Sequence, residues 1–236
     1  MISGGKEKIM KSIKDVCFVI QARLDSKRTP QKCISPFANS TLFNIGIEKL
    51  VESSLIPNEN IYVSVYEQEL IDIANEYGVN VYKRSYESAF DHGWSTPQLL
   101  YEWYDKLPHK YVVLPSVCNP LMTTKTIDKF TEQYLSSESD GLFAVLERKQ
   151  YYWDKNGNSI TDWQDRPIMN TSLVEPVYEA AHCLYASKMD MIGEGHWMDS
   201  NSPPTPELFV MEESEFFDID YPWQFEVGEV LYEKFK

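Results

Sequence analysis

Four basic side chains lie within ten residues near the start of the chain, namely Arg23, Lys27, Arg28 and Lys32. They follow the apolar run 16–20, and Asp25 is the only acidic residue among them. In an α/β domain, a loop at the carboxyl end of a buried strand brings backbone N–H groups and basic side chains to an anion. The pattern therefore predicts a phosphate site. The alternative is a basic loop that is only solvated.

A pair of carboxylates lies near the other end of the chain. Asp218 and Asp220 are two residues apart in the run 216–220, which is predicted to be a strand end, so both side chains leave the same face. Two carboxylates on one face suit Mg2+, which keeps several waters and also binds phosphate oxygens. The alternative is that Asp220 caps a helix beginning at Pro222 and that Asp218 is solvated.

Strands and helices must alternate to position these groups. The predicted strands are 16–20, 60–65, 79–82, 111–114 and 142–145, and the predicted helices are 40–54, 67–77, 96–107 and 124–135. This order predicts an α/β fold with a doubly wound, mostly parallel sheet, helices on both faces and right-handed crossovers. A closing helix is predicted from Pro222, with its inward side chains at Trp223, Val227, Val230 and Leu231.

The alternation loosens over residues 146–207. Aromatic side chains gather here with the turn 155–158, which predicts a hairpin, and the proline-rich stretch 201–206 predicts a rigid connector. We expect one domain over 1–236 that contains 146–207 as a smaller segment. Helices already cover the sheet, so the aromatic side chains of this segment are predicted to be exposed and to form a partner surface.

The composition narrows the class of protein. The formal net charge of −14 argues against nucleic acid or an anionic membrane as a partner, because both require a broad basic surface. The four cysteines are widely spaced, which predicts neither a zinc site nor a disulfide framework. The first residues lack the apolar region of a signal peptide and no stretch approaches 18 apolar residues, so we expect a cytoplasmic protein.

The order of residues in the basic loop resembles a known signature. Residues 22–32 read Ala-Arg-x-x-Ser-Lys-x-x-Pro-x-Lys, similar to the loop of the CMP-sugar synthetases, which include the acylneuraminate and Kdo cytidylyltransferases. Three further elements follow in the family's order, at 62–84, 114–122 and 217–222. The resemblance therefore extends over residues 16–231 and implies a Rossmann-like nucleotidyltransferase with a small dimerisation or lid insertion at 146–207.

The resemblance also implies roles for individual residues. Arg23, Lys27 and Lys32 would bind the triphosphate and stabilise charge on pyrophosphate, while Asp218 and Asp220 would bind Mg2+. The remaining residues that it places in the nucleotide site are Ala22, Ser26, Arg84 and Ser116.

Two further side chains are candidates for binding the acceptor. Arg166 offers a guanidinium to a carboxylated sugar, and His182 lies within an apolar run. Each has an alternative without a binding role. Arg166, like Arg84, would then be an ordinary surface arginine, and His182 would be a histidine of the core.

Four positions depart from the family pattern, namely Cys33, Tyr66, Ser116 and Met122. They stand where the family has asparagine, an acidic residue, glutamine and arginine, which leaves the acceptor open.

We expect a Mg2+-dependent transferase that moves CMP from CTP to an acidic sugar for a surface polysaccharide, releases pyrophosphate and forms a homodimer through 146–207. The alternatives are a weakened relative that binds a nucleotide or a partner protein, a cytidylyltransferase for a phosphonate or phosphate acceptor, and a nucleotide-sugar glycosyltransferase.

Overall fold

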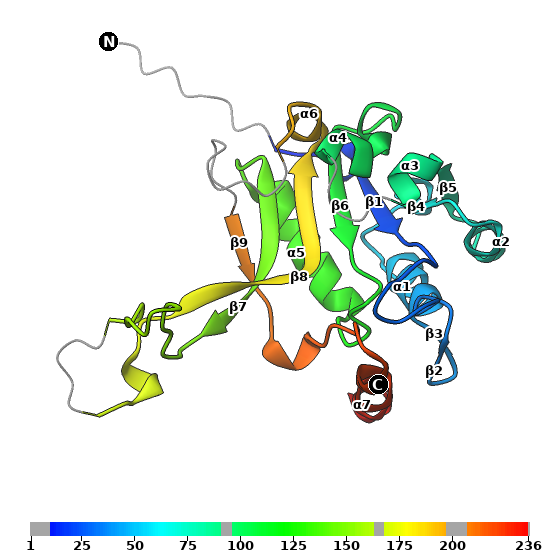
Figure 1. Cartoon of the computed structure of the whole chain (residues 1–236). Coiled ribbons are helices and arrows are strands. Elements are labelled where there is room, and N and C mark those ends of the chain that lie inside the picture. Colours follow the sequence, from blue (N-terminus) through cyan, green and yellow to red (C-terminus); the bar gives the residue numbers. More distant parts are fainter. Residues whose placement is uncertain (1–9, 91–95, 163–167, 197–206, 236) are drawn as a thin grey trace, which may run out of the picture.

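The computed structural model describes residues 10–90, 96–162, 168–196 and 207–235. Within them, seven strands form the main sheet in the order β5-β4-β1-β6-β8-β7-β9 (Figure 1). Their bounds are β1 Val16–Gln21, β4 Ile61–Val65, β5 Asn80–Lys83, β6 Tyr111–Pro115, β7 Gly141–Arg148, β8 Val177–Lys188 and β9 Glu207–Val210. Neighbouring strands pair in parallel, apart from β8, which is antiparallel to β6 and β7. A small second sheet pairs β2 Pro36–Phe37 with β3 Ser40–Thr41.

Helices connect and cover these strands. The α-helices are α1 Leu42–Val51, α2 Gln68–Glu76, α3 Tyr86–Ala89, α4 Pro97–Leu100, α5 Thr124–Ser136, α6 Met189–Gly193 and α7 Pro222–Phe235. Short 3-10 turns lie at η1 Ile13–Asp15, η2 Asn58–Asn60, η3 Glu102–Asp105, η4 Thr171–Leu173 and η5 Glu213–Glu215. The threonines Thr41 and Thr123 cap α1 and α5, because each hydroxyl accepts a hydrogen bond from a free N–H of the first turn.

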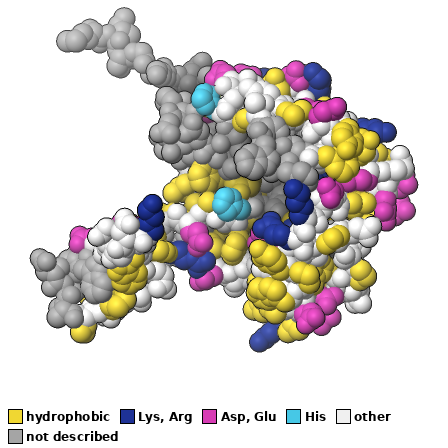
Figure 2. Space-filling view, viewed as in Figure 1, with side chains coloured by type: hydrophobic (Ala, Val, Ile, Leu, Met, Phe, Trp, Pro, Cys, Tyr) yellow, Lys and Arg dark blue, Asp and Glu magenta, His cyan; other side chains and the backbone are white. Residues whose placement is uncertain are grey.

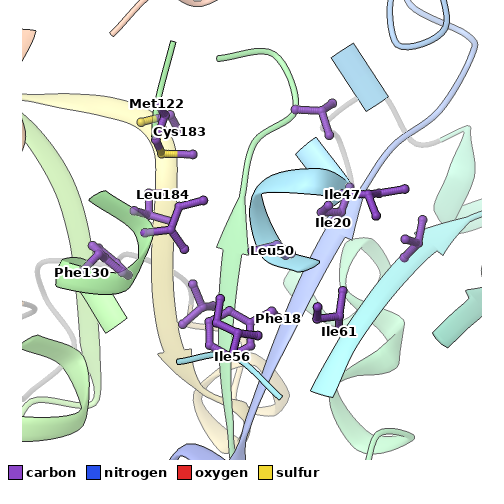
Figure 3. Close-up of a cluster of buried hydrophobic side chains, with 14 of the residues drawn as sticks. Phe18, Ile20, Ile47, Leu50, Ile56, Ile61, Met122, Phe130, Cys183 and Leu184 are labelled. Carbon is purple, nitrogen blue, oxygen red and sulfur yellow. The ribbon is translucent and has the colours of Figure 1, made fainter. Parts of the chain in front are cut away.

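The side chains of β1 alternate between two hydrophobic cores. Phe18 and Ile20 pack in a core that includes side chains of α1, α2 and α5 (Figure 3). On the other face of the sheet, Cys17 and Val19 pack with Trp103 of η3 and Ile192 of α6. Each of these β1 side chains is fully buried, and burial of a large apolar side chain contributes about 1.5–3 kcal/mol. Both faces of the sheet are therefore covered, and the predicted doubly wound α/β fold is confirmed.

Two predicted elements differ in the structure. The helix predicted over 96–107 is broken into α4 and η3, and Trp103 is the one buried side chain within them. The strand predicted over 216–220 is wrong, because this stretch is irregular and leads from η5 into α7. It still reaches the sheet's edge, where hydrogen bonds to the 116–119 loop replace strand pairing.

The buried face of α7 also differs from the prediction. Trp223, Val227 and Val230 are 59%, 42% and 66% exposed, whereas Gly228 is buried. A Cβ at Gly228 would lie 3.0 Å from Ile219 and 3.2 Å from Phe37, so the missing side chain allows the helix to approach closely. This close approach decides which of two apolar faces of α7 is buried.

Strands β7 and β8 continue beyond the body of the sheet into an extension, which we call the arm (residues 149–162 and 168–178; Figure 1). In place of a regular hairpin it contains one bridge, Trp153 to Ser159, closed by a turn in which Gly157 has φ +84°. Exposed apolar side chains along the arm are Trp153, Ile160, Ile168, Met169, Leu173, Val177 and Tyr178. The role of the arm in assembly stays a prediction. Among the described helices, none has the length and apolar character needed to cross a membrane.

Candidate active site

The basic loop lines a cavity at the point where the strand order reverses. Strands β4 and β6 pair with opposite sides of β1, so the loops that follow β1 and β6 diverge at the sheet's carboxyl edge. Open α/β sheets bind ligands at such a crevice. The cavity has a volume of about 480 Å³. Its lining residues are Gln21, Ala22, Arg23, Ser26, Lys27, Arg28, Lys32, Cys33, Ser116, Val117 and Cys118.

Short hydrogen bonds fix the course of the basic loop. Leu24 N donates to Glu67 Oε1 at 2.8 Å, and Gln31 N donates to the Leu24 carbonyl at 3.0 Å. Gln31 has φ +56°, so the chain turns sharply there before reaching Lys32. The loop is therefore a compact turn, and Figure 2 shows Lys and Arg side chains gathered in the middle of the face above α7.

Asp220 joins the end of the chain to this loop. Its Oδ1 lies 2.9 Å from Lys32 Nζ and 2.7 Å from the Arg28 guanidinium, and Thr29 Oγ1 donates to its carbonyl at 2.8 Å. Lys32 Nζ also donates to the Ile219 carbonyl at 2.9 Å. Burial lowers the pKa of Lys32, but Cys118 and Asp220 beside it raise the pKa, and the net shift is upward. Lys32 therefore stays a cation at the edge of the cavity.

Asp218 and Asp220 lie close enough to repel each other. Burial is the main cause that raises the pKa of Asp218, the charge of Asp220 adds to it, and Lys32 and Arg28 oppose it. Among the described residues no three acidic, His or Cys groups are placed to hold a metal together. Mg2+ does not need three, since it takes one or two carboxylates together with substrate phosphates and water. The two carboxylates fit that ion.

The other predicted nucleotide residues divide into two groups. Ala22, Arg23, Ser26, Lys27 and Ser116 line the same cavity. Arg84 is outside that lining: it is 4% exposed, and its guanidinium donates to the Ser88 carbonyl and hydroxyl.

The two predicted acceptor residues have different outcomes. Arg166 lies outside the described residues. His182 is exposed on β8 with φ +52°, and its Nδ1 is 2.7 Å from Tyr185 Oη. The register of β7 and β8 shifts opposite this stretch, between Phe143 and Val145, and such bulges re-aim side chains. Its exposure shows that His182 does not belong to the core, and its charge is among those that lower the pKa of Asp218.

Sequence reasoning gave no individual role to three contributors to this site, namely Arg28, Thr29 and Cys118. Arg28 and Thr29 bind Asp220, and Cys118 lines the cavity beside Lys32. Arg28 carried a signal because it belongs to the basic run. Thr29 and Cys118 carried none, since only the fold brings them near the end of the chain.

A family model described as cytidylyltransferase matches residues 17–191. The chain belongs to the cytidylyltransferase family. This CTP-dependent nucleotidyltransferase is 23% identical over 233 residues to a pseudaminic acid cytidylyltransferase of Campylobacter jejuni, covering 93% of this chain and 97% of the relative. It is 28% identical over 157 residues to an N-acylneuraminate cytidylyltransferase of Streptococcus agalactiae, covering 61% of this chain and 38% of the relative.

Solved structures agree on the fold of this cytidylyltransferase. A CMP:2-keto-3-deoxy-manno-octonic acid synthetase in complex with CTP matches with a TM-score of 0.68 at 11% identity, covering 93% of this chain and 99% of the other. A cytidylyltransferase from Leptospira borgpetersenii matches with a TM-score of 0.64 at 17% identity, covering 94% and 88%. Both likenesses support the Rossmann-like arrangement of the sheet.

Proposed function

We propose that this cytidylyltransferase transfers CMP from CTP to a small sugar acid, releases pyrophosphate and requires Mg2+. The observation that carries the proposal is the basic cavity at the switch point of the sheet, with Asp220 bound to two of its lining residues and Asp218 close to Asp220. The names of the relatives, which are pseudaminic acid and N-acylneuraminate cytidylyltransferases, support a nonulosonate-like acceptor.

The reaction requires an acceptor oxygen to attack the α-phosphorus in line. The bond from that phosphorus to the bridging oxygen breaks, its electron pair leaves with pyrophosphate, and the acceptor hydroxyl gives up its proton. Arg23, Lys27 and Lys32 would bind the phosphates and compensate the negative charge that develops on the leaving group. Lys32 is the best positioned, because Asp220 and the Ile219 carbonyl already fix its ammonium group.

Asp218 and Asp220 would hold Mg2+, which when bound supplies charge compensation to the phosphate oxygens. In this proposal His182 and Arg166 contact the acceptor. The exposed position of His182 near Asp218 supports its assignment. Ser116, at the cavity wall, would contact the nucleotide.

We also infer a homodimer formed through the arm. The arm exposes apolar side chains over much of its length, and contiguous exposed apolar surface marks partner sites.

Two assays test the proposed function. CTP with Mg2+ should raise the melting temperature more than ATP, GTP or UTP at the same concentration, because a ligand that binds only the folded state stabilises it more the tighter it binds. Pyrophosphate release is then measured with CTP against pseudaminic acid, sialic acid, Kdo and a phosphonate. Release with a sugar acid supports the proposal. Release only with the phosphonate redirects it to that acceptor class, and binding of CTP without release from any acceptor contradicts turnover.

A further inference from the structure

We propose that Lys49 and Asn119 form an anchor that holds the segment 217–220 against the basic cavity, and that both are positioning residues for the reaction. The inference rests on the proposed function in so far as that segment carries Asp218 and Asp220. Neither Lys49 nor Asn119 is among the residues that line the cavity. Their effect would therefore pass through the backbone that they hold.

Lys49 of α1 binds the loop that follows β6. It projects from the last turn of α1, and its Nζ donates to the Asn119 carbonyl at 3.2 Å and to the Pro120 carbonyl at 2.7 Å. Burial lowers the pKa of this amine to about 7, and Glu215 opposes that shift. Two N–H groups remain in the neutral amine, so it can make both hydrogen bonds in either protonation state.

Asn119 in turn binds the segment 217–220, which contains the two carboxylates. Its side chain is almost completely buried, and its Oδ1 accepts a hydrogen bond from Phe217 N at 2.9 Å. Two residues further on, Ile219 N donates to the Cys118 carbonyl at 2.8 Å. Two alternate N–H groups of the segment are thus bound to adjacent residues of one loop.

The opposite side of the segment is held by the basic loop. Lys32 binds the Ile219 carbonyl, and Thr29 binds the Asp220 carbonyl. Because 216–220 forms no strand, these contacts take the place of a regular ladder. Loss of the hydrogen bonds from the 118–119 side would leave the carboxylate segment tied to the basic loop and, through the Asp220 N–H, to Gln224 of α7. The spacing of the carboxylates from the phosphates would then no longer be fixed.

The hydrogen bond between Phe217 N and the Asn119 side chain can be removed by a single substitution. Asn119→Leu removes the acceptor for Phe217 N while keeping a similar volume. Asn119→Asp keeps an acceptor oxygen at the same place. A role in positioning therefore predicts that the aspartate variant behaves more like the wild type than the leucine variant does.

The chain also offers a matched control for Lys49. Lys11 is a buried lysine, 8% exposed, whose Nζ donates to the Ser137 carbonyl at 2.5 Å and lies 4.6 Å from the centre of the Tyr134 ring. It is remote from the cavity lining. Lys11→Met and Lys49→Met both remove an amino group that donates to a backbone carbonyl, but only Lys49 belongs to the anchor.

The first readout needs neither substrate nor metal. Amide hydrogen exchange is measured for Phe217 and Ile219 in the free protein. We expect at least tenfold faster exchange in Lys49→Met and Asn119→Leu, and less than a twofold change in Lys11→Met. Equal exchange at Phe217 and Ile219 in all variants would overturn the anchor, whatever the protein's activity.

The second readout is the Mg2+ concentration for half-maximal pyrophosphate release. Loss of a group that supports a metal ligand typically costs 10–100-fold in metal affinity or activity. We expect a shift of at least tenfold in Lys49→Met and Asn119→Leu, with Asn119→Asp close to the wild type and Lys11→Met unchanged. If Lys49→Met does not fold, the comparison of Asn119→Leu with Asn119→Asp tests the anchor instead. If the variants exchange faster but the wild type releases no pyrophosphate, the proposed function is contradicted and the anchor is supported. If the variants exchange faster but need the same Mg2+ concentration as the wild type, the positioning role is contradicted.

Discussion

The nucleotide cavity and the arm are built in opposite ways. At the cavity, the basic loop, the 116–119 loop and the 217–220 segment come from distant parts of the sequence and bind one another through many short hydrogen bonds. The arm is a continuous part of the sequence between β7 and β8, and apolar side chains along it are exposed to solvent. A two-stranded ribbon has little stability alone. The comparison indicates that contacts within the chain hold the cavity together, whereas the arm exposes the apolar surface that we propose binds a partner.

The largest effect is expected from substitutions of the two carboxylates beside the cavity. Asp218→Asn and Asp220→Asn should each lower turnover on the order of 1,000-fold, since a metal supplies several kcal/mol of charge stabilisation and 1.36 kcal/mol is tenfold in rate. Shared metal ligation predicts that the double variant loses little more than either single one.

Pyrophosphate release at saturating CTP measures these variants, and circular dichroism confirms that they fold. The control is Asp190→Asn, since Asp190 is an exposed carboxylate paired with Lys188, and it should be fully active. Full activity in the double variant would eliminate the metal site.

Lys32→Ala is expected to have the next largest effect. Removing a charged donor to the transferring phosphates should lower turnover about 100-fold or more. The sequence alone places Lys32 on an exposed loop, but only 12% of its side chain is exposed and it binds two groups of the chain's end. We therefore also expect a stability loss of about 1–3 kcal/mol. Urea unfolding and steady-state kinetics separate the two, and near-normal kinetics would contradict the phosphate role.

A charge placed on the arm tests the other half of the comparison. Leu173 is 51% exposed on the arm and Val230 is 66% exposed on α7, so Leu173→Glu and Val230→Glu are a matched pair. We expect Leu173→Glu to weaken the homodimer at least tenfold, because a central interface side chain contributes 2 kcal/mol or more. Val230→Glu should leave association unchanged. Light scattering across micromolar concentrations measures both, and a wild type that is monomeric throughout would refute the arm as a dimer surface.

The smallest expected effect concerns the pH dependence of stability. Burial lowers the pKa of Lys49 to about 7, so between pH 7 and the usual lysine value of 10.5 the unfolded chain binds more protons than the folded one. Stability therefore gains from this group as pH rises, by on the order of 1 kcal/mol per pH unit. The free energy of unfolding of the wild type relative to Lys49→Met should rise between pH 7.5 and 9.5. A constant difference would show that the amine titrates normally.

The sequence predicts the site and the sheet better than it predicts the end of the chain. The strand β1 and the basic loop are local patterns, and the cavity residues Ala22 to Lys32 follow from them directly. The closing helix carries apolar residues on two faces, and periodicity cannot tell which is buried. The close approach of Gly228 to Phe37 and Ile219 decides this, and Phe37 lies nearly two hundred positions away in the sequence.

His182 shows the same limit on a smaller scale. Its apolar neighbours indicate a core position, yet a positive φ and a shift in register turn its side chain outward. Backbone irregularities of this kind depend on the pairing of whole strands. Residue type alone gave no sign of it.

The close packing of α1 under the cavity has an evolutionary consequence. A Cβ at Gly46 would lie 2.7 Å from Val117 Cγ1, a distance that real side chains do not tolerate. Positions 46 and 117 should therefore covary among relatives, with a larger residue at one accompanied by a smaller residue at the other. For protein engineering, the same constraint means that an alanine at position 46 requires a residue smaller than valine at position 117.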